Sequence, residues 1–189
     1  MGLFDLLKGL LGGGSDKGKV EPAFIQGESG QVIVHRHSGF RFPQDVSEYV
    51  GVGPTQYDEK GLDVSVGYNH AKLMGLAVTV YVYPDSGGPG SLAGQYEGCK
   101  AEVSGAHASV KVLSEEVLSG APNGTQTEGR KALFSFEDEL GGINLSSLSE
   151  LWLFSHKGFF IKFRASYPDS MKPHAPQAVV GLIKELSWP

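Results

Sequence analysis

The chain has 189 residues, of which 40% are hydrophobic and 20% are charged, and its net charge is −5 at pH 7. This composition suits one globular domain with a short appendage, which has enough apolar material to fold without disulfides or a metal. It carries no basic surplus to neutralise nucleic-acid phosphates, and its single cysteine, Cys99, excludes an internal disulfide framework. We therefore expect a protein of a reducing compartment that does not bind nucleic acid.

Residues 1–11 predict a short amphipathic helix. Five apolar side chains recur at helical spacing, namely Leu3, Phe4, Leu7, Leu10 and Leu11. The run is shorter than the ~20 apolar residues that span a bilayer, and it lacks the basic start of a secretory signal. Residues 12–27, which begin GGGSDKGK, predict a flexible linker. We expect the helix to be mobile and to contact a membrane, a partner protein or a second copy of itself.

The next part of the chain predicts strands joined by glycine turns. One strand begins at Val32 and runs into His35 and His37, and GFRFP (39–43) is short and extended because of its proline. Residues 49–57 predict an edge strand, because glycines and Pro54 weaken the pattern. Residues 63–68 alternate as a half-buried strand, and the apolar run LAVTVYVY at 76–83 predicts a central strand covered on both faces.

A helix and further strands follow the loop SGGPG at 86–90. Apolar residues from Leu92 to Val117 recur at helical spacing. The helix either follows this whole stripe or ends near His107, in which case 109–118 forms a strand. Residues 131–137 alternate as a strand, and 151–155 pairs with 159–166 as a hairpin through Gly158. A closing helix covers 174–186.

The order of these elements predicts an α+β fold. Strands joined by short turns pair antiparallel, and two amphipathic helices suffice to cover both faces of one sheet. We therefore expect a mainly antiparallel sheet flanked by helices, an α/β/α sandwich, in a single domain over residues 28–189. Residues on the apolar side of each element should form its core, including Val80, Phe134, Phe163 and Leu182.

Residues 30–189 resemble the Mog1/PsbP-like superfamily. The likeness rests on the early GFRFP element, the hairpin strands, the middle helix, LWLFSHKGFFIKFRASYP at 151–168 and the closing helix that ends LIKELSWP. The resemblance implies that fold and a role as an adaptor, assembly factor or small accessory protein, largely without enzymatic activity. It supplies no functional residues, because no motif of the family matches this chain residue by residue.

One candidate binding surface comes from two strands. Lys162 and Arg164 project from one face of their strand, and Tyr81 and Tyr83 project from one face of another. If the two faces coincide, they form an aromatic and basic surface for an anionic ligand or an acidic partner segment. The simpler interpretation is that the stems of Lys162 and Arg164 cover the sheet while their charges reach water.

Other candidate chemistry is weaker. His35 and His37 could supply two imidazoles to zinc or copper, but no third ligand has a recognisable spacing, and a solvated strand is the simpler interpretation. The SGGPG loop lacks the Lys-Ser/Thr ending of a phosphate loop. Asp138 and Glu139 look like part of a solvated turn, and Cys99 lies on the apolar stripe of its helix, which predicts a buried thiol.

These observations favour a non-enzymatic binding or accessory module that needs no cofactor. We expect an unknown protein partner and a cytoplasmic location, with the N-terminal helix contacting a membrane, a partner protein or a second copy of itself. The alternative is a small metal-binding protein or enzyme that uses His35 and His37.

Overall fold

The computed structural model describes residues 22–27, 30–88, 90–107, 109–140 and 143–189. Its strands are β1 (Phe24–Gln26), β2 (Val32–His35), β3 (Arg41–Pro43), β4 (Asp45–Val46), β5 (Tyr49–Gln56), β6 (Val64–His70), β7 (Ala77–Pro84), β8 (Lys111–Leu118), β9 (Glu128–Leu140), β10 (Ile143–His156) and β11 (Phe159–Pro168). Its helices are α2 (Ser91–Ala106), the 3-10 turn η1 (Asp169–Met171) and α3 (Ala175–Glu185).

The main sheet has eight strands in the order β4-β5-β6-β7-β11-β10-β9-β8, and β1-β2-β3 form a smaller sheet. Every paired strand is antiparallel. The hairpin between β10 and β11 turns through Lys157 and Gly158, which both have positive φ, at 48° and 79°. Such a two-residue turn matches the twist of the strands that it joins. The predicted α+β fold with a mainly antiparallel sheet is therefore confirmed.

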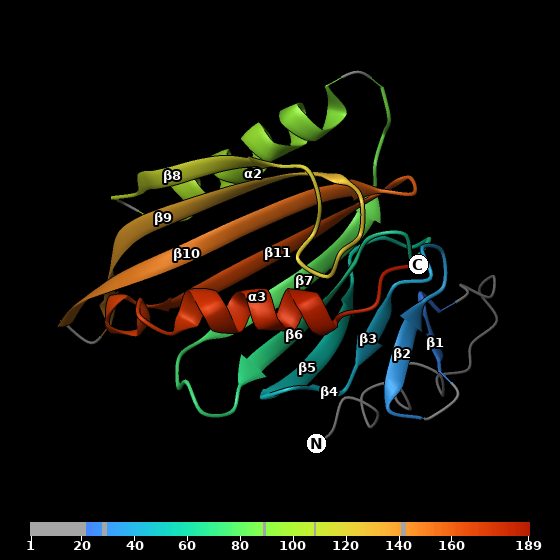
Figure 1. Ribbon diagram of the computed structural model, residues 1–189, viewed down its shortest axis with the longest axis horizontal. Coiled ribbons are helices and arrows are strands. Elements are labelled where there is room, and N and C mark those ends of the chain that lie inside the picture. The colour runs from blue at the N-terminus through green and yellow to red at the C-terminus, as the bar shows by residue number, and fades with distance from the viewer. Residues whose placement is uncertain (1–21, 28–29, 89, 108, 141–142) are drawn as a thin grey trace.

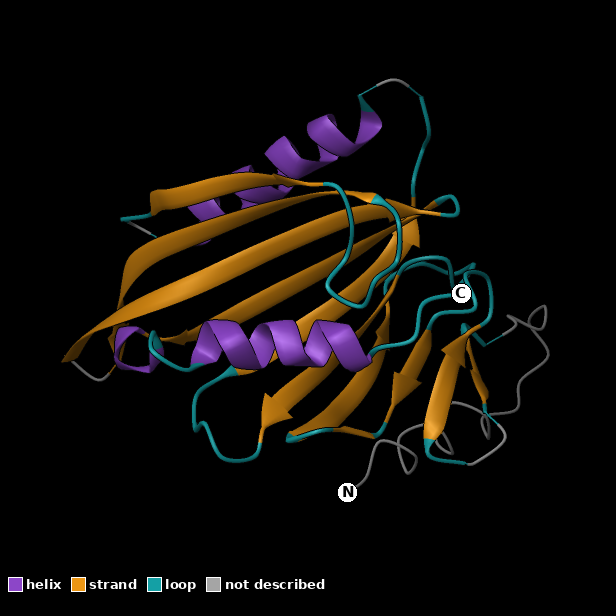
Figure 2. Ribbon diagram, viewed as in Figure 1, coloured by secondary structure: helices purple, strands orange, loops and turns teal. Residues whose placement is uncertain are grey.

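The two helices lie on opposite faces of the main sheet (Figures 1 and 2), with α3 in front and α2 behind its β8–β10 side. The alternation of β10 divides its side chains between these faces. Trp152 and Phe154 belong to the larger core under α3, and Leu151 and Leu153 pack in the smaller core under α2. A period of two is the reason that one strand can supply both cores.

The larger core joins α3, the main sheet and the small sheet. Val80, Phe163 and Leu182 are fully buried there, and Phe134 is fully buried in the core under α2, so the predicted core positions are confirmed. The C-terminal segment also belongs to this core, because the ring of Trp188 stacks on Phe163 with centroids 6.1 Å apart.

The helix α2 covers only part of the sheet face on which it lies. Its buried residues Tyr96, Cys99 and Val103 pack against side chains of β9, β10 and β11. The buried Cys99 agrees with the sequence prediction. The same face of β5, β6 and β7 is left open, and Val50 and Val52 are 45% and 43% exposed there. β7 is therefore buried on one face and half-buried on the other, whereas the sequence predicts cover on both.

The structure decides the alternative that the sequence left open between Leu92 and Val117, because α2 ends at Ala106 and Lys111–Leu118 form β8 at the sheet edge. Two other expectations about local structure need correction. The predicted linker 12–27 extends too far, because residues 24–26 form β1 and pair with β2. Asp138 and Glu139 lie in β9, paired with β10, and not in a turn.

Among the residues that the structure describes, no helix combines the length and the apolar character needed to cross a membrane.

Candidate functional site

The structure brings the predicted aromatic and basic residues together on one face of the sheet. β11 pairs with β7 so that Lys162 lies opposite Tyr81 and Arg164 lies opposite Thr79. Directly paired residues project to the same side of an antiparallel sheet. The two faces that the sequence left unconnected therefore coincide, on the side that carries α2.

Lys162 is held in place within this surface. Its Nζ lies 4.4 Å from the ring centre of Tyr81 and 5.5 Å from that of Tyr83, which are cation–π distances. It also donates to Oε2 of Glu102, on α2, at 3.4 Å. Only 9% of Lys162 is exposed, so its charge does not extend into water as the simpler sequence interpretation suggests.

Arg164 has no such partners. Its Nε is shielded from water and donates to no described group. No ion pair joins its guanidinium to a carboxylate of the described residues. Burial lowers the pKa of this guanidinium, because the charged form loses part of its hydration. Arg164 is therefore a partly buried cation with unused hydrogen-bond donors.

Tyr83 contributes to helix packing and not to the open surface. Its hydroxyl accepts a hydrogen bond from Nε2 of Gln95 at 3.0 Å and lies 3.8 Å from Sγ of Cys99. Its ring packs beside Phe160, with centroids 5.5 Å apart. Tyr83 thus belongs to the interface with α2, although it was predicted to line the same site as Tyr81.

Three residues that the sequence did not single out extend the surface. Tyr57 stacks on Tyr81 with centroids 6.3 Å apart, is 55% exposed and shares a hydrogen bond of 3.0 Å with the Ser65 hydroxyl. Val50 and Val52 project from β5 on the same side, because their strand partners are Asn69 and Gly67. We call this surface the open face and define it by Val50, Val52, Tyr57, Thr79, Tyr81, Lys162 and Arg164.

The two candidate metal-binding histidines are used for other contacts. Nε2 of His35 lies 2.8 Å from the carbonyl oxygen of Gly61, so this nitrogen carries the proton and donates. Nδ1 then accepts from the Ser38 hydroxyl at 2.7 Å, and that hydroxyl in turn accepts from the N–H of Phe40. Nε2 of His37 lies 3.0 Å from the Lys60 carbonyl oxygen. His35 is fully buried with both ring nitrogens bonded and offers no lone pair to a metal.

The described residues contain no group of three His, Cys, Asp or Glu side chains placed to hold a metal ion. The arrangement around His35 fits a structural role that links β2 to the turn before β6.

The residues predicted to contact a membrane or a partner, Leu3, Phe4, Leu7, Leu10 and Leu11, lie outside the described residues.

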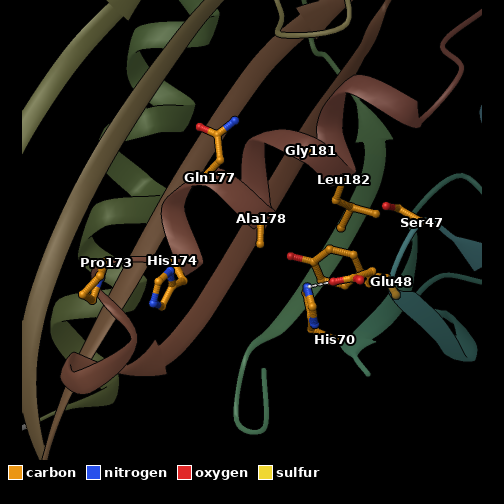
Figure 3. A pocket seen from close by; sticks show the side chains of 10 residues that line it. Ser47, Glu48, His70, Pro173, His174, Gln177, Ala178, Gly181 and Leu182 are labelled. Atoms are coloured by element: carbon orange, nitrogen blue, oxygen red, sulfur yellow. Dashed lines mark ion pairs between the residues drawn. The ribbon is translucent and has the colours of Figure 1, made fainter. Parts of the chain in front are cut away.

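A cavity of about 440 Å³ lies on the opposite face, between the β5–β6 edge of the sheet and α3. Figure 3 shows Glu48 and His70 on the strand side, Gln177 and Ala178 on α3, and His174 just before α3. Sequence reasoning missed this cavity, because its two walls are about a hundred residues apart along the chain. The one local signal is Ser47, which lines the cavity with a positive φ of 52°.

No family model matches the chain, and no curated protein sequence matches it. Two of the solved structures that are similar to this chain illustrate the likeness. One is the solution structure of cyanobacterial PsbP (CyanoP) from Synechocystis sp. PCC 6803, which is 10% identical with a TM-score of 0.49, over 95% of this chain and 99% of that chain. The other is the crystal structure of the Saccharomyces cerevisiae Ran-binding protein Mog1p, which is 8% identical with a TM-score of 0.47, over 90% and 96% of the two chains.

The two structures are a PsbP and a Mog1 protein, which are the two proteins named in the predicted resemblance. The likeness concerns the fold alone, and the partner named for Mog1p belongs to that protein.

Proposed function

We propose that this protein is a non-enzymatic binding or accessory module whose open face recognises an acidic, aromatic-containing segment of a partner protein. The observation that carries the proposal is Arg164, a partly buried cation that has no carboxylate partner within the described chain. A partner carboxylate would supply the missing acceptor in a charge-assisted hydrogen bond.

The surroundings of Arg164 favour a peptide over a small anion. On the same face of the sheet, across β7 and β6 from Arg164, Val50, Val52 and Tyr57 are large side chains that stay 43–55% exposed. Apolar surface of this kind is buried when a partner side chain packs on it. Tyr57 and Tyr81 already stack on each other, so the pair offers a rigid aromatic platform.

One carboxylate competes for this surface. Glu102 projects from α2 and reaches Lys162 at 3.4 Å, but its side chain is 64% exposed. Lys162 is only 11% exposed, so a partner carboxylate reaches it by replacing Glu102. Arg164 needs no such exchange, which makes it the primary anchor and Lys162 the secondary one.

The test is fluorescence anisotropy with the full chain and labelled peptides in which Glu alternates with Phe. A matched peptide in which Lys replaces every Glu reports the contribution of charge. We expect Arg164→Gln to weaken binding of the Glu–Phe peptide at least about tenfold. Added salt should weaken the wild-type complex as well, because screening reduces charge attraction.

Lys172→Gln is the control variant, because Lys172 is an exposed cation just before α3, away from the open face. It should bind the Glu–Phe peptide as the wild type does. Equal binding by Arg164→Gln and wild type, or equal binding of the Glu–Phe and Lys–Phe peptides, contradicts the proposal.

A further inference from the structure

The β5 side of the open face carries large side chains that no other described element covers. Val50, Val52 and Tyr57 are 45%, 43% and 55% exposed. The helix on this side of the sheet, α2, lies over the β8–β10 part and leaves the strands from β5 to β7 open (Figure 1). Apolar surface gathered in this way is a place where another apolar segment packs.

The neighbouring strands present small side chains on the same face. Gly67 of β6 lies between Val52 of β5 and Thr79 of β7 in the strand register. Asn69 and Ala77 form the next pair and are both exposed. Adjacent strands are about 4.8 Å apart, so the distance from β5 to β7 is about 10 Å. This is about the diameter of a helix with its side chains, so one helix fits over these three strands.

The described chain begins beside this surface. Ala23 packs directly against Gly61, because a Cβ added at Gly61 would lie 2.8 Å from the Cβ of Ala23. Gly61 belongs to the turn between β5 and β6, which is closed by a hydrogen bond of 2.9 Å from the Tyr57 N–H to the Asp63 carbonyl. The segment that precedes Pro22 is therefore attached at the end of the sheet where Tyr57 stands.

Residues 1–11 can reach the whole β5 side from this point. The connection, residues 12–21, spans up to about 35 Å when it is extended. The strand from Val50 to Tyr57 is about 24 Å long, and a helix of the length of residues 1–11 is about 16 Å long. A segment tethered this closely has an effective concentration in the range of about 1 mM at the surface.

The chemistry of residues 1–11 matches that of the β5 side. Asp5 and Lys8 lie off the apolar stripe of the predicted helix, so both charges face water when the stripe packs on the sheet. The contact is then apolar on both sides, and Arg164, on β11, lies beyond the three strands that the helix covers. The stripe consists of Leu3, Phe4, Leu7, Leu10 and Leu11.

We propose that residues 1–11 form a helix that packs on Val50, Val52 and Tyr57 of their own chain and occupies the β5 side of the open face when no partner is bound. The inference rests on the proposed function in one respect, namely that the partner segment binds to the open face. The aromatic side chains of that partner need the same apolar surface, so the partner and residues 1–11 compete. Arg164 stays accessible to a partner carboxylate throughout.

Amide NMR spectra of the full chain without any peptide test the intramolecular contact. Leu7→Gln weakens the apolar stripe, and Val52→Gln weakens the surface that the stripe meets. We expect both variants to move the same amide signals, those of residues 1–11 and of the β5–β6 hairpin, toward the same positions. Val117→Gln is the matched control, because Val117 is a 75% exposed valine on the distant strand β8. It should leave those signals in place.

Two outcomes of this comparison overturn the proposal. Signals of the β5–β6 hairpin that stay unchanged in Leu7→Gln show that residues 1–11 do not contact this surface. Wild-type signals that move to the Leu7→Gln positions on dilution show that the segment binds a second copy of the chain instead. High salt should not release the segment, because the contact is apolar, whereas it weakens the charge-dependent binding of the Glu–Phe peptide.

The competition is measured with the labelled Glu–Phe peptide. Leu7→Gln should bind this peptide about three- to tenfold more tightly than the wild type, because apparent affinity rises with the fraction of molecules whose surface is free. Unchanged affinity in Leu7→Gln contradicts the competition. If neither form binds the peptide, the proposed function fails, whereas matching spectra of Leu7→Gln and Val52→Gln still support the contact itself.

Discussion

Replacing Phe163 by alanine tests whether the core under α3 holds the sheet together. Phe163 is fully buried in β11, between Val80 and Trp152 on the neighbouring strands. Its ring lies 6.4 Å from Phe154 and 6.1 Å from Trp188, measured between centroids. These neighbours belong to two strands, β7 and β10, and to the C-terminal segment, so they cannot all move inward to fill the space that the ring leaves.

The expected effect of Phe163→Ala is a loss of about 3–5 kcal/mol in the free energy of unfolding, from lost apolar burial and the cavity that remains. For a chain of this size each kcal/mol shifts the melting temperature by about 2–4 °C, so the shift should be about 10 °C. Urea melts followed by circular dichroism measure the loss directly.

Val117→Ala is the control for that measurement, because Val117 is 75% exposed on β8. Its free energy of unfolding should stay within about 0.5 kcal/mol of the wild type. A loss below ~1 kcal/mol for Phe163→Ala, with an unchanged dependence on urea, would refute the buried position of Phe163.

Three further predictions concern pH, backbone packing and the N-terminal segment. Burial lowers the pKa of His35 and His70 from the ordinary 6.5, so the unfolded chain takes up more protons in acid. Urea melts should therefore show stability falling from about pH 7 to about pH 5.5, and falling less in His35→Gln. Gly129→Ala should destabilise the fold, because the new Cβ would lie 2.4 Å from Cδ1 of Phe154, and a thermal melt measures the loss. If residues 1–11 contact membranes, the full chain should sediment with lipid vesicles and Leu7→Glu should not; a wild-type chain that stays in the supernatant contradicts that expectation.

The sequence determined much of the fold, because its signals are local. Gly158 marks the hairpin turn, and alternation over 159–166 places Phe163 on one face and Lys162 on the other. These features depend on turn chemistry and on the two-residue period of a strand, which act over a few residues. The boundary between helix and strand near His107 was left open, because apolar spacing fits both structures there and the edge position of β8 decides between them.

The tertiary structure decided the open face and the cavity beside α3. Lys162 meets Glu102 across 60 residues of chain, and the cavity joins Tyr49 and His70 to Gln177. The open face exists because α2 covers only part of its side of the sheet. The local sequence of a helix does not predict which strands of a sheet the helix will leave uncovered. Likewise, His35 has a structural role because the Gly61 carbonyl, 26 residues away, accepts a hydrogen bond from its Nε2–H. Contacts of this kind depend on how distant segments pack, and strand periodicity or residue type cannot encode them.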